Sequence, residues 1–213
     1  MNKCEKLIAG CIAADCVNPV FTGMDSLAYI FNKKDITFGD PTTADPNVFT
    51  SITMRTYTPE GGTDPVTTVG YTIDQLGKQP YTGTNTAMVE GNVSNKFTET
   101  LNFVVPDNSP AAAMLLDNIA NGKFVVIVKN EYKGSDGRAE FQVYGGKKGL
   151  VATAMEREAY SEDTDGGWAV TLTAENTPNS AMFIEHKTGN TVDTESYLLT
   201  FVDTCQPEQG SGN

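Results

Sequence analysis

Short runs with the alternation of β-strands occupy most of the chain, and they restrict its fold more than any other feature. Each run is apolar or alternating, rich in β-branched and aromatic residues, and bounded by Gly, Pro, Asn or Asp, as is typical of strands. Because so many such runs follow one another, the sequence predicts a mainly β fold, an antiparallel β-sandwich or barrel. The predicted strands lie in SLAYIFNKKDITF, VFTSITMRTY, TTVGYTIDQL, TAMVEGNVS, KFTETLNFVVP, KFVVIVKNEY, AEFQVYGGKKGLVATAMEREAY, GWAVTLTAE, AMFIEHK and SYLLTFVD.

The run KFTETLNF at 96–103 indicates how one face of such a strand packs. Phe97, Leu101 and Phe103 fall on one side of a strand, whereas threonine and asparagine side chains fall on the other. Glu99 is the single acidic residue in the apolar row. The apolar side is expected to face the core and the polar side to face water.

One segment, DNSPAAAMLLDNIANG, has helical rather than strand periodicity. Ser109 is suited to the N-cap, Pro110 to the first helical position and Gly122 to a left-handed C-cap. The sequence therefore predicts one flanking α-helix over about residues 109–121, which covers a face or an edge of the sheet. The residues expected on one side of this helix are Ala111, Met114, Leu115 and Ile119.

The charge of the chain limits its partners. Its 213 residues include 27 acidic and 15 basic side chains, for a formal net charge of −12. Such a surface is unsuited to gripping phosphate groups by counterion release, although it is suited to repelling them. A chain of this length suits one all-β domain or two small ones, and one domain is the simpler interpretation. The predicted boundaries are an N-terminal arm at 1–20, a β-sandwich domain at 21–204 and a flexible C-terminal tail at 205–213.

The cysteines give little support for a metal site. Cys4, Cys11, Cys16 and Cys205 include no C-x-x-C pair, whereas zinc sites favour ligands paired at short spacing. A disulfide joining the two ends of the chain is an alternative, but free thiols are the favoured interpretation for a chain without an export signal. No metal and no cofactor are predicted.

The run LIAGC near the start matches the small-residue pattern of lipoprotein processing at Cys11. Lys3 and Lys6 supply a basic start, but only Leu7 to Gly10 lies between the last lysine and the cysteine. A secretory signal needs roughly 7–15 apolar residues there, and a membrane span needs ~20. The segment is therefore expected to belong to the mature protein, with lipidation as the alternative.

Motifs of catalysis are scarce. His186 follows a predicted strand and has no serine or cysteine nucleophile pattern with it, which favours a solvated strand-end residue. The acidic run SEDTDGG at 161–167 lacks the spacing of an EF-hand and predicts a hairpin turn. GGKKG at 145–149 predicts a bend within a long strand rather than a phosphate loop. The sequence predicts no catalytic residue and no enzymatic activity.

The C-terminal half carries a resemblance to a known family. The strand running into Tyr144-Gly145-Gly146, the strand from Gly149 to Tyr160, the acidic DTDGG turn and the strand GWAVTLTAEN resemble the same half of major tail tube proteins from long-tailed bacteriophages, particularly Bacteroides-type phages and prophages. The segment NPVFTGMDSLAYIFNKKDIT resembles the first strand of that family. The resemblance covers roughly residues 17–204 and leaves out the N-terminal cysteines.

The resemblance implies a structural protein of the virion tail, assembled in the host cytoplasm. Proteins of this family are β-sandwiches or barrels with one flanking helix, and they form hexameric rings that stack into a hollow tube through which the genome leaves the capsid. The implied partners are further copies of the chain and other tail proteins such as the tape measure and the tail terminator. DNA would pass through the lumen without specific binding, and no membrane would be involved.

Acidic side chains that face the lumen would suit this function, because their repulsion of phosphate keeps DNA hydrated and mobile. The alternation in AMEREAY puts Glu156 and Glu158 on one side of a strand and Arg157 on the other. Glu156 and Glu158 are therefore the candidates to line the lumen, with Glu99 as a further candidate.

Two polar, glycine-containing segments, 57–70 and 77–96, are too long for simple turns and are predicted to be long loops or extended hairpins. Long loops in a compact domain are usually functional or contact a partner. We therefore expect contacts between stacked rings in these segments or in the terminal arms. The residues expected to make them are Glu60, Gly61, Gly62, Thr63, Asp64, Tyr81 and Asn85.

A function of another class is the alternative for the same sequence. The chain would then be a secreted or surface β-sandwich binding module, lectin-like or adhesin-like, anchored through a lipidated Cys11. The intact mass distinguishes the two, because cleavage and acylation would delete residues 1–10 and add a lipid.

Overall fold

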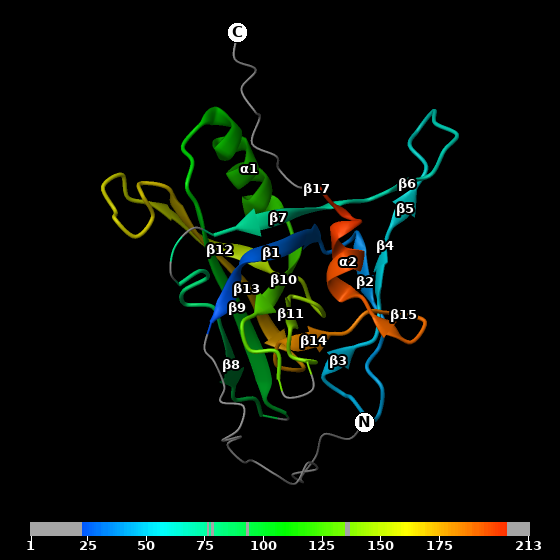
Figure 1. Ribbon diagram of the computed structural model, residues 1–213. Coiled ribbons are helices and arrows are strands. Elements are labelled where there is room, and N and C mark those ends of the chain that lie inside the picture. Colours follow the sequence, from blue (N-terminus) through cyan, green and yellow to red (C-terminus); the bar gives the residue numbers. More distant parts are fainter. Residues whose placement is uncertain (1–22, 76, 78, 93, 135–136, 204–213) are drawn as a thin grey trace.

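The computed structural model describes residues 23–75, 77, 79–92, 94–134 and 137–203, and these form packed β-sheets with two helices (Figure 1). The predicted arm at 1–20, the predicted tail at 205–213 and all four cysteines lie outside the described residues. The fold is mainly β, as the alternating runs predict, and its sheets pack as a sandwich rather than a closed barrel.

The first helix follows the ninth strand, and the second helix comes shortly before the last strand. The helices are α1 (Pro110–Asn121) and α2 (Thr194–Leu199). The strands are β1 (Met24–Asn32), β2 (Ile36–Phe38), β3 (Val48–Phe49), β4 (Ile52–Met54), β5 (Thr56–Tyr57), β6 (Val66–Thr67), β7 (Gly70–Asp74), β8 (Asn85–Val89), β9 (Lys96–Val105), β10 (Phe124–Asn130), β11 (Phe141–Tyr144), β12 (Val151–Arg157), β13 (Trp168–Thr177), β14 (Met182–Ile184), β15 (Lys187–Thr188), β16 (Thr191–Val192) and β17 (Val202–Asp203).

A seven-stranded sheet in the order β17-β7-β1-β10-β11-β14-β3 runs through the middle of the molecule. Successive residues of its central strands enter two different cores. Ala28 and Val126 pack in the first core, and their neighbours Tyr29 and Ile127 pack in the second. A strand with both faces buried has an uninterrupted apolar sequence, which is why β10 begins FVVIV.

The first core lies between the central sheet and a four-stranded antiparallel sheet in the order β12-β13-β9-β8. Leu101 of β9 and Leu172 of β13 are fully buried there, and Leu116 of α1 closes the same core. Each such side chain stabilises the fold by about 1.5–3 kcal/mol through removal of apolar surface from water. The alternation of KFTETLNF thus predicts the correct inward face of β9.

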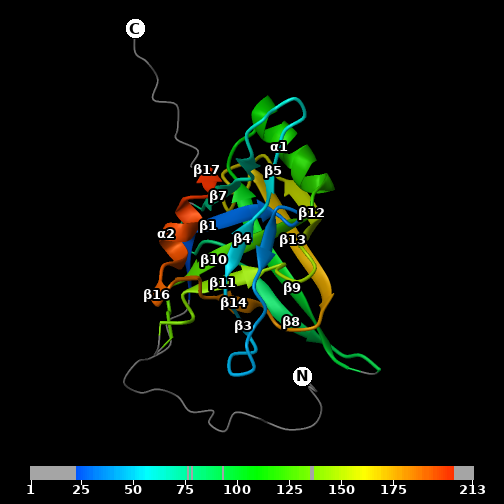
Figure 2. The same cartoon turned by 90° about the vertical axis from the view of Figure 1, so that its right-hand side faces the viewer.

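The second core lies on the opposite face of the central sheet, under α2 and the β2–β4 pair. Ile52 and Leu198 are buried in it, and the rings of Phe38 and Phe49 stack with centroids 4.7 Å apart. Figure 2 shows α2 on one side of β1 and β10, with β9, β12 and β13 on the other. The described residues therefore form three layers that share the central sheet.

One predicted strand is in fact two strands in different sheets. Its sequence is AEFQVYGGKKGLVATAMEREAY. β11 belongs to the central sheet and β12 to the four-stranded sheet. The GGKKG segment is the predicted bend, but it turns the chain from one sheet into the other. Gly145 and Gly149 have φ angles of 75° and 81° there, a left-handed conformation that glycine adopts without steric cost.

SYLLTFVD is only partly a strand, contrary to prediction. Its first half lies in α2, and only Val202–Asp203 forms a strand, which pairs parallel to β7. β3 and β14 are also parallel, so the central sheet is not wholly antiparallel. A short apolar run has too few residues for its periodicity to distinguish a helix from a strand.

α1 begins as predicted and ends differently. Ser109 is the N-cap, and its hydroxyl oxygen accepts a hydrogen bond from the N–H of Ala112 at 3.2 Å. Gly122 follows the helix with φ −89° and ψ 172°, an extended conformation rather than the predicted left-handed C-cap.

The buried face of α1 also differs from the prediction. Leu116 and Ile119 are buried, whereas Met114 and Leu115, which share a face with Ile119 in the prediction, are 65% and 49% exposed. The helix carries apolar residues on more than one side, so its periodicity alone does not select the face that packs. No helix in the described ranges is long and apolar enough to span a membrane.

Candidate assembly surfaces

The outer face of the four-stranded sheet, which is turned away from the first core, is rich in threonine. Thr100 lies opposite Thr173, and Asn102 lies opposite Thr171, across the β9–β13 pair. Small hydroxyl side chains on adjacent strands hydrogen-bond to one another, as Thr153 and Thr173 do at 2.9 Å. This face is therefore polar, neutral over most of its area and made of short side chains.

Charged side chains flank the threonines on this face. Glu156 of β12 lies opposite Ala169, and its neighbour Met155 points to the first core, so Glu156 points outward and is exposed. Glu175 of β13 is also exposed on this side, and Lys96 stands at the start of β9. Sequence reasoning missed Glu175, although the alternation of TLTAEN would have identified it.

Glu158 is exposed but lies one residue beyond the end of β12, in the turn that leads to β13. The structure therefore places Glu156 on the outer face and Glu158 on the hairpin tip. The prediction that the two glutamates share one side of a strand is wrong, because the strand ends at Arg157.

Glu99 does not face a solvent-filled space, so the expectation that it lines a lumen is wrong. Its side chain is 4% exposed, between the two sheets, and one of its carboxylate oxygens accepts a hydrogen bond from the Gly145 N–H at 2.6 Å. Burial raises the pKa of this carboxyl, and the hydrogen bond from Gly145 opposes that shift in part. Glu99 thus anchors the bend between β11 and β12.

The four-stranded sheet ends at β8 on one side and at β12 on the other. Within the described residues, neither strand pairs with another strand on its outer side. Met88 and Val89 of β8 are 62% and 41% exposed, and Val151 of β12 is 39% exposed. An edge strand with unpaired backbone groups and exposed apolar side chains is a template for pairing with another chain.

The segment 57–70 forms a narrow hairpin in which β5 and β6 pair, and it projects far from the body (cyan in Figure 1). Its tip carries Glu60, Gly61, Gly62, Thr63 and Asp64, and all five are exposed. Gly61 has a φ of 81° with nothing within 4 Å of an added Cβ, so the tip makes no close contact there. The predicted contact residues of this segment are thus available to a partner.

The segment 77–96 contains β8, which overlaps the run TAMVEGNVS that predicts a strand. Asn85 begins that strand and is exposed. Tyr81 is not available to a partner, contrary to prediction: its side chain is 4% exposed, and its hydroxyl lies 2.8 Å from the Ser26 carbonyl oxygen and 3.0 Å from that of Ile73. Tyr81 therefore fixes this loop to β1 and β7.

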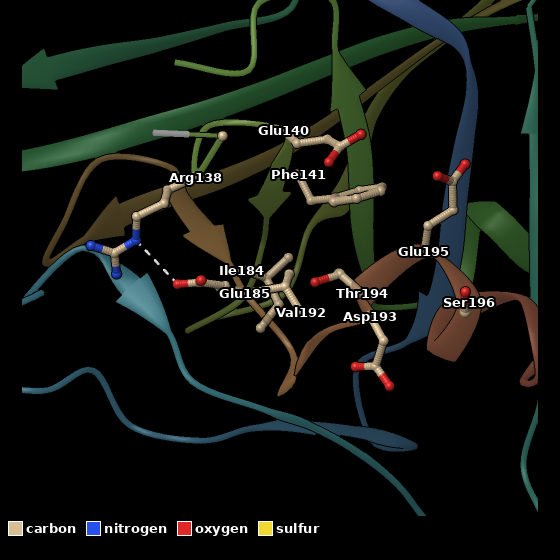
Figure 3. A pocket seen from close by; sticks show the side chains of 11 residues that line it. Arg138, Glu140, Phe141, Ile184, Glu185, Val192, Asp193, Thr194, Glu195 and Ser196 are labelled. Atoms are coloured by element: carbon tan, nitrogen blue, oxygen red, sulfur yellow. Dashed lines mark hydrogen bonds and ion pairs between the residues drawn. The ribbon is translucent and has the colours of Figure 1, made fainter. Parts of the chain in front are cut away.

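A cavity of about 400 Å³ lies between β11, β14 and the start of α2 (Figure 3). Arg138 donates to Asp45 at 2.7 Å and to Glu185 at 3.1 Å, and the hydrogen bond from Arg138 lowers the pKa of the Asp45 carboxyl. Lys129 donates to Glu195 at 2.7 Å. These ion pairs link lining residues to Asp45 and Lys129 beside the cavity, so they join segments that lie far apart in the sequence. No group of three potential metal ligands occurs among the described residues.

His186 is buried, so the prediction of a solvated strand-end residue is wrong. It is 7% exposed, its Nδ1 accepts a hydrogen bond from the Ile52 N–H at 3.1 Å, and its ring stacks on Tyr197 with centroids 3.7 Å apart. These contacts join β4 to α2. A histidine that ties two elements together has a structural role here.

No protein-family model, curated protein or solved structure matches this chain. The likeness to tail tube proteins therefore rests on the sequence patterns, and the case for a function rests on the surfaces described above.

Proposed function

We propose that the chain is the subunit of a bacteriophage tail tube, in which stacked hexameric rings enclose the channel through which DNA leaves the capsid. The observation that carries this proposal is the four-stranded sheet, whose two edge strands have no outer partner among the described residues and whose outer face is rich in threonine. The subunit has a structural role and catalyses no reaction. Its other partners are tail proteins such as the tape measure and the tail terminator, and its place is the virion.

The two edges of the sheet support ring formation. If β8 of one copy pairs with β12 of the next, the sheet continues from subunit to subunit, and both edges become satisfied. The contact joins two different surfaces, so it repeats in one direction and closes into a ring when the rotation per subunit allows. The outer faces of the sheets then form the wall of one continuous channel.

The chemistry of the outer face supports the passage of DNA. Threonine side chains carry no charge that would trap phosphate, and Glu156 and Glu175 repel it. Lys96 at one end of the sheet is the basic residue placed on this face by the strand register. A wall of this kind keeps a polyanion mobile.

The proposal is tested by electron microscopy of the concentrated protein in low salt. We expect rings with sixfold symmetry and tubes made of stacked rings. The variant Ala87→Lys/Met88→Lys places two lysines on the β8 edge, where they oppose pairing with a second copy. We expect this variant to remain monomeric with unchanged circular dichroism.

Thr191→Lys/Val192→Lys is the matched control, because it also adds two lysines and both residues are exposed in the separate β15–β16 pair. It should assemble like the unmodified chain. Monomers alone in the unmodified protein at millimolar concentration would contradict the proposal, as would normal rings in the β8 variant.

A further inference from the structure

Four lysines gather around the bend between β11 and β12, although basic residues are in the minority in this chain. We call Lys33, Lys123, Lys147 and Lys148 the lysine corner. The Lys33 N–H donates to the Lys123 carbonyl oxygen at 2.8 Å, and both side chains lie against Gly149.

The charge of the lysine corner is poorly neutralised. Lys147 has one ion pair, at 3.6 Å from Asp40, whose side chain is 93% exposed, and the Lys148 ammonium donates to the Glu175 carbonyl oxygen. Among the residues that the structure describes, Lys33, Lys123 and Lys148 form no salt bridge. Burial first, and the charge of Lys147 second, lower the pKa of Lys33.

The opposite charge is concentrated at the tip of the β12–β13 hairpin, which projects from the body at the left of Figure 1 (yellow). We call Glu158, Glu162, Asp163 and Asp165 the acidic tip; all four are exposed. None of them forms a salt bridge within the described part of the chain.

The acidic tip has a defined shape and an aromatic side chain. The Arg157 guanidinium donates to the Gly166 carbonyl oxygen at 2.9 Å, and the Gly166 N–H donates to Ser161 at 3.1 Å, so the turn is closed by its own hydrogen bonds. Tyr160 is 95% exposed within it. Exposed tyrosines are enriched at the centres of protein interfaces, and a tyrosine ring also attracts lysine ammonium groups.

The lysine corner and the acidic tip lie at opposite ends of β12. The strand has 7 residues, and at the usual rise it separates the two surfaces by about 23 Å. β12 is paired along its length with β13, so the tip of one molecule does not fold back onto its own corner. A contact between the two surfaces therefore needs a second molecule.

We propose that the acidic tip of one copy docks on the lysine corner of a second copy. The contact is heterologous, so it repeats head to tail along the direction of β12. This inference rests on the proposed tube: within it, the contact joins a subunit to the next ring, whereas β8 and β12 pair within a ring. Tyr160 supplies the apolar area, and the charges set the orientation and the rate of association.

Charge reversal tests this contact. Lys123→Glu/Lys148→Glu reverses the corner, and Glu162→Lys/Asp163→Lys reverses the tip; all four side chains are exposed. Assembly is followed by light scattering and electron microscopy at low salt. Each reversal alone should raise the concentration of half-assembly by about tenfold or more, since several charged pairs become repulsive at once.

The chain that carries both reversals should assemble again, because the corner and the tip are then complementary with exchanged signs. An equimolar mixture of the two singly reversed chains should assemble as well. Asp117→Lys/Glu131→Lys is the control for the net charge of the tip reversal, since both residues are exposed and belong to neither surface. It should assemble like the unmodified chain.

Three outcomes distinguish failure of the proposed function from failure of this contact. If the unmodified chain does not assemble, the proposed function fails and this contact fails with it. If it assembles and single reversals have no effect, or the double reversal does not restore assembly, only this inference is overturned. The same holds if the corner reversal abolishes binding of labelled duplex DNA and leaves assembly intact, because the corner would then be a nucleic-acid site.

Discussion

At the scale of single residues, Glu99 shows how burial changes the behaviour of a carboxyl group. Its raised pKa means that the folded state holds the proton more tightly than the unfolded chain does. The protonated form therefore contributes stability that is present below the ordinary pKa of a glutamate, about 4.3. That contribution is lost as the pH rises through the raised pKa.

Replacing Glu99 by glutamine should therefore become more favourable as the pH rises. Glutamine retains an oxygen that accepts from the Gly145 N–H and has no charge to bury. We expect the melting temperature of Glu99→Gln, relative to that of the unmodified chain, to increase from pH 5 to pH 8. Glu99→Ala should lower stability by about 1–3 kcal/mol at both pH values, because it leaves the Gly145 N–H without its acceptor. A difference between glutamine and glutamate that shrinks with pH would contradict this account.

The sequence does not reveal which residues form hydrogen bonds with the buried polar side chains. Alternation identifies the apolar row of β9 and the place of Glu99 in it, but the acceptor role of Glu99 depends on Gly145 in another sheet. The sequence predicts Tyr81 and His186 at the surface, because it does not show which distant residues contact their side chains. Each is buried by contacts with residues far away in the sequence.

At the scale of elements, the bend between β11 and β12 requires glycine. A Cβ on Gly145 would lie 2.8 Å from the Leu150 backbone nitrogen and 2.8 Å from the Phe124 carbonyl oxygen. Gly145→Ala should therefore destabilise the fold by about 2–4 kcal/mol, since it adds left-handed strain to a steric clash. Gly61→Ala is the control: Gly61 has a similar φ but open space around it, so its cost should be about 1 kcal/mol. Urea denaturation measures both, and equal costs would show that the clash is relieved elsewhere.

The β5–β6 hairpin gives a second prediction at this scale. The residues of its tip are exposed, so deletion of residues 60–64 should change the free energy of unfolding by less than about 1 kcal/mol and the melting temperature by less than about 2 °C. If the tip reaches a neighbouring ring, the same deletion should block tube formation and leave single rings. Electron microscopy distinguishes these outcomes, and tubes of normal length would exclude the hairpin from the contact.

Elements were predictable where a local signal decides them. Ser109 and Pro110 identify the start of α1. The uninterrupted apolar run of β10 indicates a strand that is buried on both faces. The exposed face of α1 was not predictable, because Met114 and Leu115 are as apolar as the residues of the buried face. The choice of face depends on how the helix meets β12, a tertiary contact.

At the scale of the whole molecule, the net charge of −12 is distributed unevenly over the surface. Carboxylates collect at the acidic tip and on the outer face of the four-stranded sheet, whereas four lysines, one of them paired with Asp40, collect at the corner. Composition shows that acidic residues are in excess, but it does not show that the acidic and basic residues are separated in space. That separation depends on where the fold places each turn.

The outer face carries the last prediction, because it would line the channel. Glu156→Lys/Glu175→Lys reverses two exposed charges on that face without touching a core side chain. Tubes should still form, and they should retain labelled duplex DNA at 50 mM salt, since added cations bind phosphate by counterion release. Retention should fall steeply by 500 mM salt as the charges are screened. Tubes of the unmodified chain and of Asp117→Lys/Glu131→Lys, which has the same net charge, should release the DNA; equal retention by that control would show that the outer face of the sheet does not meet DNA.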